Sequence, residues 1–141
     1  MISINRSIQY GGRFAIRQLS PEDRQRVETF LKRAKALLPT NQCTFKLTNK
    51  NKSFDNKYNL RHSQKIDIIR SITVDDFIET KRNEVPGYPD TNLYVFHKAV
   101  KLLLYGEEAE VVVYVKEYIL DDNNMEMVIV ISLHEEGLHD L

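Results

Sequence analysis

The sequence predicts one α+β domain, in which N-terminal helices pack on one face of a C-terminal antiparallel sheet. Apolar residues recur at helical spacing between residues 20 and 80, whereas from residue 92 onward they alternate and are rich in β-branched side chains. The 141 residues suit one hydrophobic core, and 42% of them are hydrophobic. We therefore expect residues 1–141 to form a single domain.

The first helix is predicted to begin after Ser20. Its hydroxyl can accept an unpaired backbone N–H, and Pro21 is tolerated at the first helical position. The apolar residues that follow at helical spacing are Val27, Phe30, Leu31, Ala34, Leu37 and Leu38. Pro39 ends this helix. Residues 1–19, before it, are expected to form an N-terminal arm or a short strand.

The next segment is rich in Lys and Asn. Residues 43–48 alternate weakly, which leaves a short strand and a loop both open. Residues 49–59 are polar, with Phe54 and Tyr58 as apolar anchors, and are predicted to form an exposed basic loop. A second helix is expected to start near Ser63.

A further helical turn is predicted over residues 74–80, with Thr73 as its cap. Residues 81–91 contain two prolines and form a loop. The predicted sheet is an antiparallel meander over residues 92–136. Its three strands cover residues 93–100, 111–119 and 127–134. Leu102–Leu104 either extends the first strand or forms a helical turn.

The zero net charge conceals a division of the chain. Residues 1–70 carry 15 Lys or Arg and 5 Asp or Glu, a net charge of +10, and residues 71–141 carry the reverse, −10. A basic face beside an acidic one suits a polyanion such as RNA, and it also suits a charged protein partner. Alternatively, the two halves pair with each other across the fold.

Several classes of protein are excluded or disfavoured. Cys43 is the single cysteine, so no intrachain disulfide can form, and we expect it to be buried. No apolar run approaches the roughly 20 residues of a membrane-spanning helix, and no signal peptide is evident, so a cytoplasmic location is expected. Phosphate-binding and dinucleotide motifs are absent, and no cofactor or metal is predicted. The best metal-ligand alternative combines His134 and His139 with Glu135.

Strand alternation predicts which side chains share a face. In the middle strand, Tyr114 and Lys116 point away from Val113, and in the last strand Ser132 and His134 point away from Leu133. The residues expected to pack on the helices are Val111, Val113, Val115, Met127, Ile129, Ile131 and Leu133. Alternation does not decide whether His97 or Lys98 joins the polar face.

Such a face suits RNA cleavage without a metal ion. His134 can act as acid or base, because the reference pKa of histidine lies near neutrality. Lys98 and Lys116 can hold the phosphate, and Tyr114 can position it or stack on a base. The alternative interpretation is that these are ordinary side chains of a half-exposed sheet.

Four motifs in order resemble the MqsR-type toxins of bacterial toxin–antitoxin pairs. The motifs are IRSITVDDF at Ile69–Phe77, LYVFHK at Leu93–Lys98, VYVK at Val113–Lys116 and VISLHE at Val130–Glu135. The resemblance covers roughly residues 28–136. It implies a RelE-like fold with the RNA site on the sheet face opposite the helices, metal-independent cleavage of mRNA, and inhibition by a cognate antitoxin.

The resemblance also implies roles for single residues. Tyr114 and Lys116 match the family's Tyr-Leu-Lys strand motif, and His134 stands where the founding toxin has a catalytic lysine. Glu79 and Val95 replace a catalytic lysine and a glutamine of the founding toxin, so Lys98 and His134 are the natural substitutes.

The residues predicted to contact RNA are Lys46, Lys50, Lys52, Lys57, Arg61 and Lys81. The alternative function is a non-catalytic interaction module that binds the product of an adjacent gene. The sequence predicts no oligomeric state.

Overall fold

The computed structural model describes residues 19–83 and 91–137, and it confirms the α+β fold with the helices preceding the sheet. The helices are α1 (Pro21–Leu37), α2 (Asn49–Tyr58), α3 (His62–Ser71) and the 3-10 turn η1 (Val74–Asp76). The strands are β2 (Cys43–Phe45), β3 (Phe77–Arg82), β4 (Asn92–Leu104), β5 (Glu107–Asp122) and β6 (Met125–Glu135). The predicted arm, except for residue 19, and most of the predicted loop over 81–91 lie outside the described residues.

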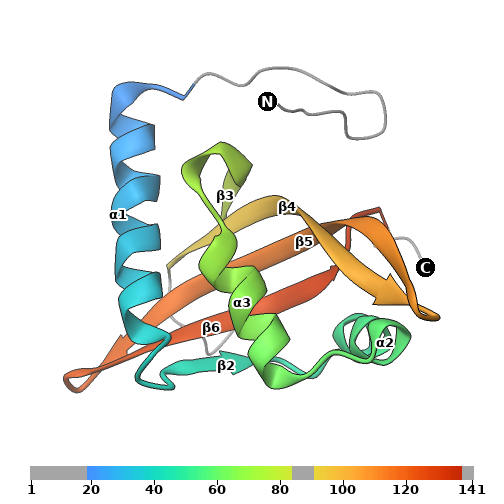
Figure 1. Cartoon of the computed structure of the whole chain (residues 1–141). Helices are drawn as coiled ribbons and strands as arrows, with labels where there is room; N and C mark the ends of the chain where they lie inside the picture. Colours follow the sequence, from blue (N-terminus) through green and yellow to red (C-terminus); the bar gives the residue numbers. More distant parts are fainter. Residues whose placement is uncertain (1–18, 84–90, 138–141) are drawn as a thin grey trace.

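The sheet has five strands in the order β2-β6-β5-β4-β3. Three of its pairings are antiparallel, including the predicted meander β4-β5-β6, and β2, which the sequence left open as a strand or a loop, pairs parallel to β6. The connection from β2 to β6 contains α2, α3 and the strands β3, β4 and β5, so it is long enough to bring β6 back parallel to β2. The helices lie on one face of the sheet (Figure 1).

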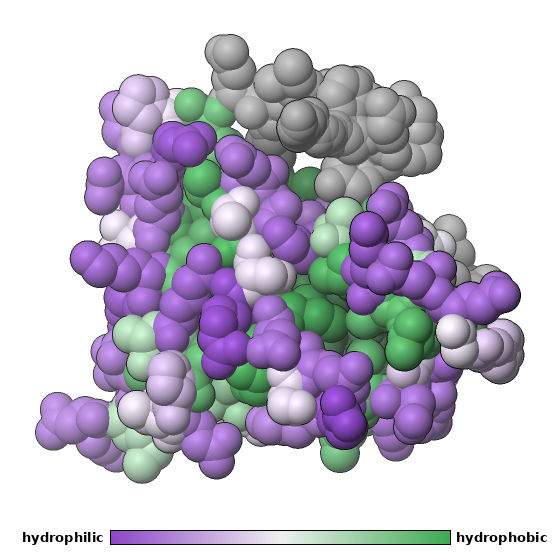
Figure 2. Space-filling view, viewed as in Figure 1, coloured by the Kyte–Doolittle hydropathy of each residue, from purple (hydrophilic) through white to green (hydrophobic). Residues whose placement is uncertain are grey.

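Helix α1 begins as predicted, because the Ser20 hydroxyl accepts the backbone N–H of Asp23 at 3.1 Å. Its buried side chains join a core with α3 and the strands. Figure 2 shows a mostly hydrophilic surface from the same direction, with hydrophobic side chains visible between α1 and α3. Within the described residues, no helix is both long enough and apolar enough to cross a membrane.

The predicted loop over residues 49–59 is in fact helix α2. The Thr48 hydroxyl caps it by accepting the N–H of Asn51 at 3.1 Å. Phe54 and Tyr58, four residues apart, are buried on one side of the helix and contact each other. The basic side chains are therefore displayed from a helix rather than from a loop.

The predicted helical turn over residues 74–80 is also shorter than expected. Helical structure covers only Val74–Asp76, and the chain then continues as edge strand β3, which pairs with β4. Leu102–Leu104 belongs to β4, whose partner strand β5 starts directly after the turn at Tyr105 and Gly106. The β4–β5 hairpin is thus longer than the sequence pattern indicated.

An irregularity in β6 changes which of its residues face the helices. Ser132 pairs with Lys116 and Val130 pairs with Glu117, so Ile131 is an extra residue in a bulge. The alternation of side chains shifts by one at this point. Of the predicted core residues in this strand, only Leu133 packs with the helices. The other residues of β6 that do so are Val128 and Val130, whereas Met127, Ile129 and Ile131 belong to a second cluster with Leu93 and Tyr118.

Candidate functional site

Three aromatic side chains lie side by side on the sheet face opposite the helices. Tyr114 pairs in register with His97 of β4 and with His134 of β6. The ring centroids of Tyr114 and His134 are 5.3 Å apart with an interplanar angle of 13°, and those of Tyr114 and His97 are 5.7 Å apart. With Lys116 and Ser132, which also pair in register, these residues form what we call the outer-face cluster.

The structure therefore confirms that Tyr114, Lys116, Ser132 and His134 share one face. Their neighbours Val113, Val115 and Leu133 point the other way into the core with the helices. His97, whose orientation the sequence left open, joins the cluster. His97 and His134 are nearly buried, and Tyr114 and Lys116 are half-buried.

One hydrogen bond fixes the protonation pattern of neutral His134. Its Nδ1 lies 2.9 Å from the backbone carbonyl oxygen of Glu135. Because a carbonyl can only accept, Nδ1 must carry the hydrogen. In the neutral imidazole, Nε2 is then the nitrogen that takes up a proton.

Lys116 lies in a cationic environment. Partial burial lowers the pKa of its ammonium, and the positive charges of Lys81 and Lys50 lower it further. These lysines come from three elements, β5, β3 and α2, and two of them, Lys50 and Lys81, were predicted to contact RNA. An anion bound beside Lys116 relieves this repulsion.

Lys98 does not belong to the outer-face cluster. It lies on the helix side of β4, opposite Val113 in the register, and its Nζ donates to Asp76 Oδ2 at 3.2 Å. Both side chains are largely buried, and burial raises the pKa of Asp76 while Thr73 and Lys98 lower it. The structure therefore does not bring Lys98 together with Tyr114, Lys116 and His134, because the odd-numbered residues of β4 face outward.

The other predicted RNA-contacting residues differ in their surroundings. Lys57 Nζ donates to Glu135 Oε1 at 2.7 Å, and the Tyr58 hydroxyl donates to the same oxygen at 2.9 Å. Lys52 and Arg61 are exposed, whereas Lys46 is half-buried. Of the ion pairs within the described residues, those that join the basic and acidic halves are Arg24–Asp75, Arg33–Glu126 and Lys57–Glu135.

Asn51 is a structural residue that sequence reasoning missed. Its side-chain Nδ2 donates to the carbonyls of Lys46 and Ile131, and its Oδ1 accepts the N–H of Leu133, each at 2.9 Å. The amide thus takes the place of a neighbouring strand beside the β6 bulge, next to His134. The available signal was the spacing of Asn51, which lies three residues before Phe54 and seven before Tyr58 and so shares their side of a helix.

Glu79 and Val95, which the resemblance aligns with catalytic residues of the founding toxin, face each other across β3 and β4. Val95 in turn pairs with Lys116. The positions that the resemblance relates to catalysis are therefore contiguous with the outer-face cluster. At positions 79 and 95 this chain has neither a lysine nor a side-chain amide.

Glu117 is a second residue that the sequence analysis left out. It is fully buried on the helix side of β5, and neither carboxylate oxygen has a hydrogen-bond partner in the structure. Burial raises its pKa to about 8, an effect that Lys35 partly offsets. Cys43 is buried as predicted, and burial, aided by the charge of Glu117, raises the pKa of its thiol to about 12.

Among residues 19–83 and 91–137, no three His, Cys, Asp or Glu side chains converge as a set of metal ligands. His139, part of the metal-ligand alternative, lies outside these residues. No protein-family model, curated protein or solved structure matches the chain.

Proposed function

We propose that this chain is the toxin of a toxin–antitoxin pair and cleaves mRNA on the outer face of its sheet without a metal ion. The observation that carries the proposal is the stacking of Tyr114 against His134 beside Lys116, on the face opposite the helices. This is where the resemblance to MqsR-type toxins puts the RNA site. The order and spacing of the four motifs support the same assignment.

The proposed reaction is an attack of the ribose 2′-oxygen on the adjacent phosphorus. His134 Nε2 takes the 2′-hydroxyl proton, and the P–O5′ bond breaks as the new P–O2′ bond forms. Lys116 stabilises the extra negative charge of the phosphorane. His97, protonated and on the other side of the Tyr114 ring, gives a proton to the leaving 5′-oxygen, and the products are a 2′,3′-cyclic phosphate and a 5′-hydroxyl.

The basic side chains near the cluster hold the RNA backbone. Lys50 and Lys81 are close enough to Lys116 to affect its pKa, so they contact the phosphates next to the cleaved bond. Lys52 on α2 and Arg61 at the start of α3 are exposed and extend this contact. Because His97 and His134 are nearly buried, binding of RNA begins at Tyr114 and Lys116 and widens access to the imidazoles.

Expression of the chain without its partner tests the proposal in cells. We expect growth arrest and loss of mRNA, and relief of both by His134→Ala and by Tyr114→Phe. The matched controls are His62→Ala and Tyr105→Phe, since both residues are exposed and lie outside the cluster, His62 at the start of α3 and Tyr105 in the turn between β4 and β5. Unimpaired growth with intact mRNA at verified expression counts against the proposal.

The second candidate is a non-catalytic module on the same fold. Glu79 and Val95 favour it, because they occupy catalytic positions of the founding toxin without supplying a cation or an amide. For such a module we expect tight binding to the product of an adjacent gene and no RNA cleavage by the purified chain.

A further inference from the structure

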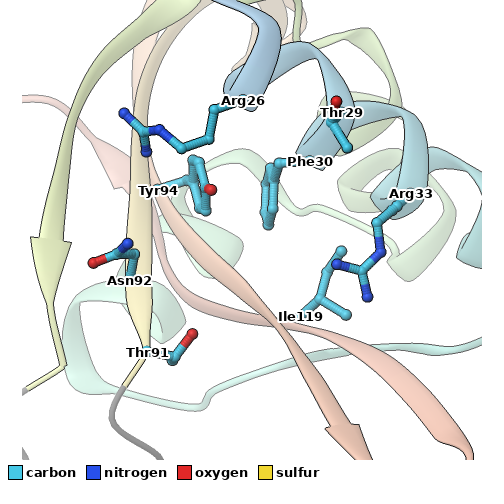
Figure 3. A pocket seen from close by; sticks show the side chains of 8 residues that line it. All are labelled: Arg26, Thr29, Phe30, Arg33, Thr91, Asn92, Tyr94 and Ile119. Carbon is cyan, nitrogen blue, oxygen red and sulfur yellow. The ribbon is translucent and has the colours of Figure 1, made fainter. Parts of the chain in front are cut away.

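A groove of about 330 Å³ lies between α1 and the sheet, on the side away from the outer-face cluster. Its wall on α1 carries Arg26, Thr29, Phe30 and Arg33, and its wall on the sheet carries Thr91, Asn92, Tyr94 and Ile119. Figure 3 shows the guanidinium groups of Arg26 and Arg33 on either side of the Phe30 and Tyr94 rings. The volume is at the lower end of the range for small-molecule sites.

The two arginines give the groove its charge. They are seven residues apart on α1, which is two helical turns or roughly 10 Å along the axis. Both guanidiniums are partly exposed, with exposed side-chain fractions of 38% for Arg26 and 48% for Arg33. A guanidinium offers paired N–H donors that match a carboxylate or phosphate group.

The aromatic rings restrict what can bind between the arginines. Phe30 stacks on Tyr94 with a centroid distance of 3.9 Å, and Phe96 follows Phe30 at 6.3 Å. The remaining face of Tyr94 lies 5.8 Å from the guanidinium carbon of Arg26. Both faces of the Tyr94 ring are therefore occupied, one by Phe30 and the other by Arg26, and are not available to a planar ligand such as a nucleobase. The ring edges, which carry partial positive charge, favour an anion instead.

Each of the two guanidinium groups already forms an ion pair with an acidic side chain. Arg26 Nη2 is 3.0 Å from Asp23 Oδ1, and Arg33 pairs with Glu126. Ion pairs as exposed as these contribute little, typically about 0.2–1 kcal/mol, so an incoming oxyanion can displace them. The carboxylates act as internal competitors for the site.

From the charge, the size and the closed ring stack, we propose that this groove binds a small molecule carrying a phosphate or carboxylate group between Arg26 and Arg33. Thr29, Thr91 and Asn92 supply further hydrogen bonds to it. This site is independent of the proposed RNA cleavage, because it lies on the helix side of the sheet.

Calorimetric titration of the full chain with ribose 5-phosphate, and separately with citrate, tests the proposal and distinguishes the two anions. We expect saturable binding of at least one probe. Arg26→Ala and Arg33→Ala should each weaken it about tenfold or more, as loss of a charge-assisted hydrogen bond implies. Asp23→Asn and Glu126→Gln should strengthen it about two- to fivefold by removing the competing carboxylates.

Lys32→Ala is the matched control, because Lys32 is an exposed cation of α1 that does not line this groove. It should leave binding of the probe within about twofold of the unmodified chain. Absence of saturable binding for both probes overturns the proposal. So does an equal loss with Lys32→Ala and Arg33→Ala, or a lack of any gain with Asp23→Asn and Glu126→Gln. These last two variants keep the test valid even if an arginine variant fails to fold.

Discussion

The two faces of the sheet use the same strands for different purposes. On the helix side, Phe96, Val113 and Val115 are completely buried in the main core. On the outer side, the residues next to them in sequence are His97, Tyr114 and Lys116, which can transfer protons or hold an anion. Within one strand, alternate side chains therefore either stabilise the core or stand on the polar outer face.

Each face also contains an exception. The helix side includes the buried acid Glu117 and the ion pair of Lys98 with Asp76. The outer side includes a small apolar cluster of Leu93, Tyr118 and Ile129 beyond the β6 bulge. The outer-face cluster is therefore a polar patch bordered by apolar residues, which makes the electrostatic interactions within it stronger.

The largest expected effect concerns Glu117 and pH. Its pKa is about 8 in the fold, against a value near 4.5 when unfolded, so the folded chain keeps a proton that the unfolded chain releases. The free energy of unfolding should therefore fall as pH rises from about 4.5 to 8, by up to about 5 kcal/mol, and then level off.

Denaturant unfolding over this pH range measures the effect, with Glu117→Gln as the comparison because it cannot ionise. The difference in stability between the two proteins should grow in favour of Glu117→Gln as pH rises. A constant difference across the range would show that Glu117 titrates normally.

Removal of a core side chain from the helix side should give the next largest effect. Phe96→Ala takes out a fully buried ring that contacts Phe30 and Phe77, and should destabilise the fold by about 4 kcal/mol. Thermal melting measures this change. RNA cleavage per folded molecule should be retained, and a selective loss of cleavage would contradict the division between the faces.

Asn51→Ala tests the support behind the outer-face cluster. The substitution leaves a buried N–H and a buried carbonyl beside the β6 bulge without partners, so we expect a loss of about 2–3 kcal/mol. Asn56→Ala, at an exposed position of the same helix, should have little effect on melting. Equal melting temperatures for the two variants would mean that water replaces the amide.

The smallest effect is expected for Lys98. Lys98→Met removes a largely buried ion pair, while Asp76 keeps its hydrogen bonds to Thr73, so the loss of stability should be about 1–2 kcal/mol. Because Lys98 faces the helices, RNA cleavage should be unchanged. Lys116→Met is the matched variant on the other face and should reduce cleavage.

Much of the fold follows from local patterns in the sequence. Ser20 and Pro21 mark the start of α1 correctly, and alternation in β5 assigns Tyr114 and Lys116 to the same face. Both features depend only on residues close in the chain, which is why they can be predicted.

The errors arise where tertiary contacts decide. The Asn-rich segment forms α2 because Phe54 and Tyr58 reach the core, although its composition favours a loop. The extra residue Ile131 inverts the alternation in β6, and only the pairing with β5 shows it. Alternation also could not decide between His97 and Lys98, because that choice depends on which face of β4 the helices cover.

Cleavage of mRNA by the purified chain in the presence of a metal chelator tests the central claim most directly. We predict cleavage that His134→Ala reduces by at least about 100-fold per folded molecule, while His62→Ala leaves it unchanged. The products should carry 2′,3′-cyclic phosphate and 5′-hydroxyl ends. Cleavage that survives His134→Ala, or a folded chain that cleaves no RNA, would contradict the claim that the outer-face cluster is a ribonuclease site.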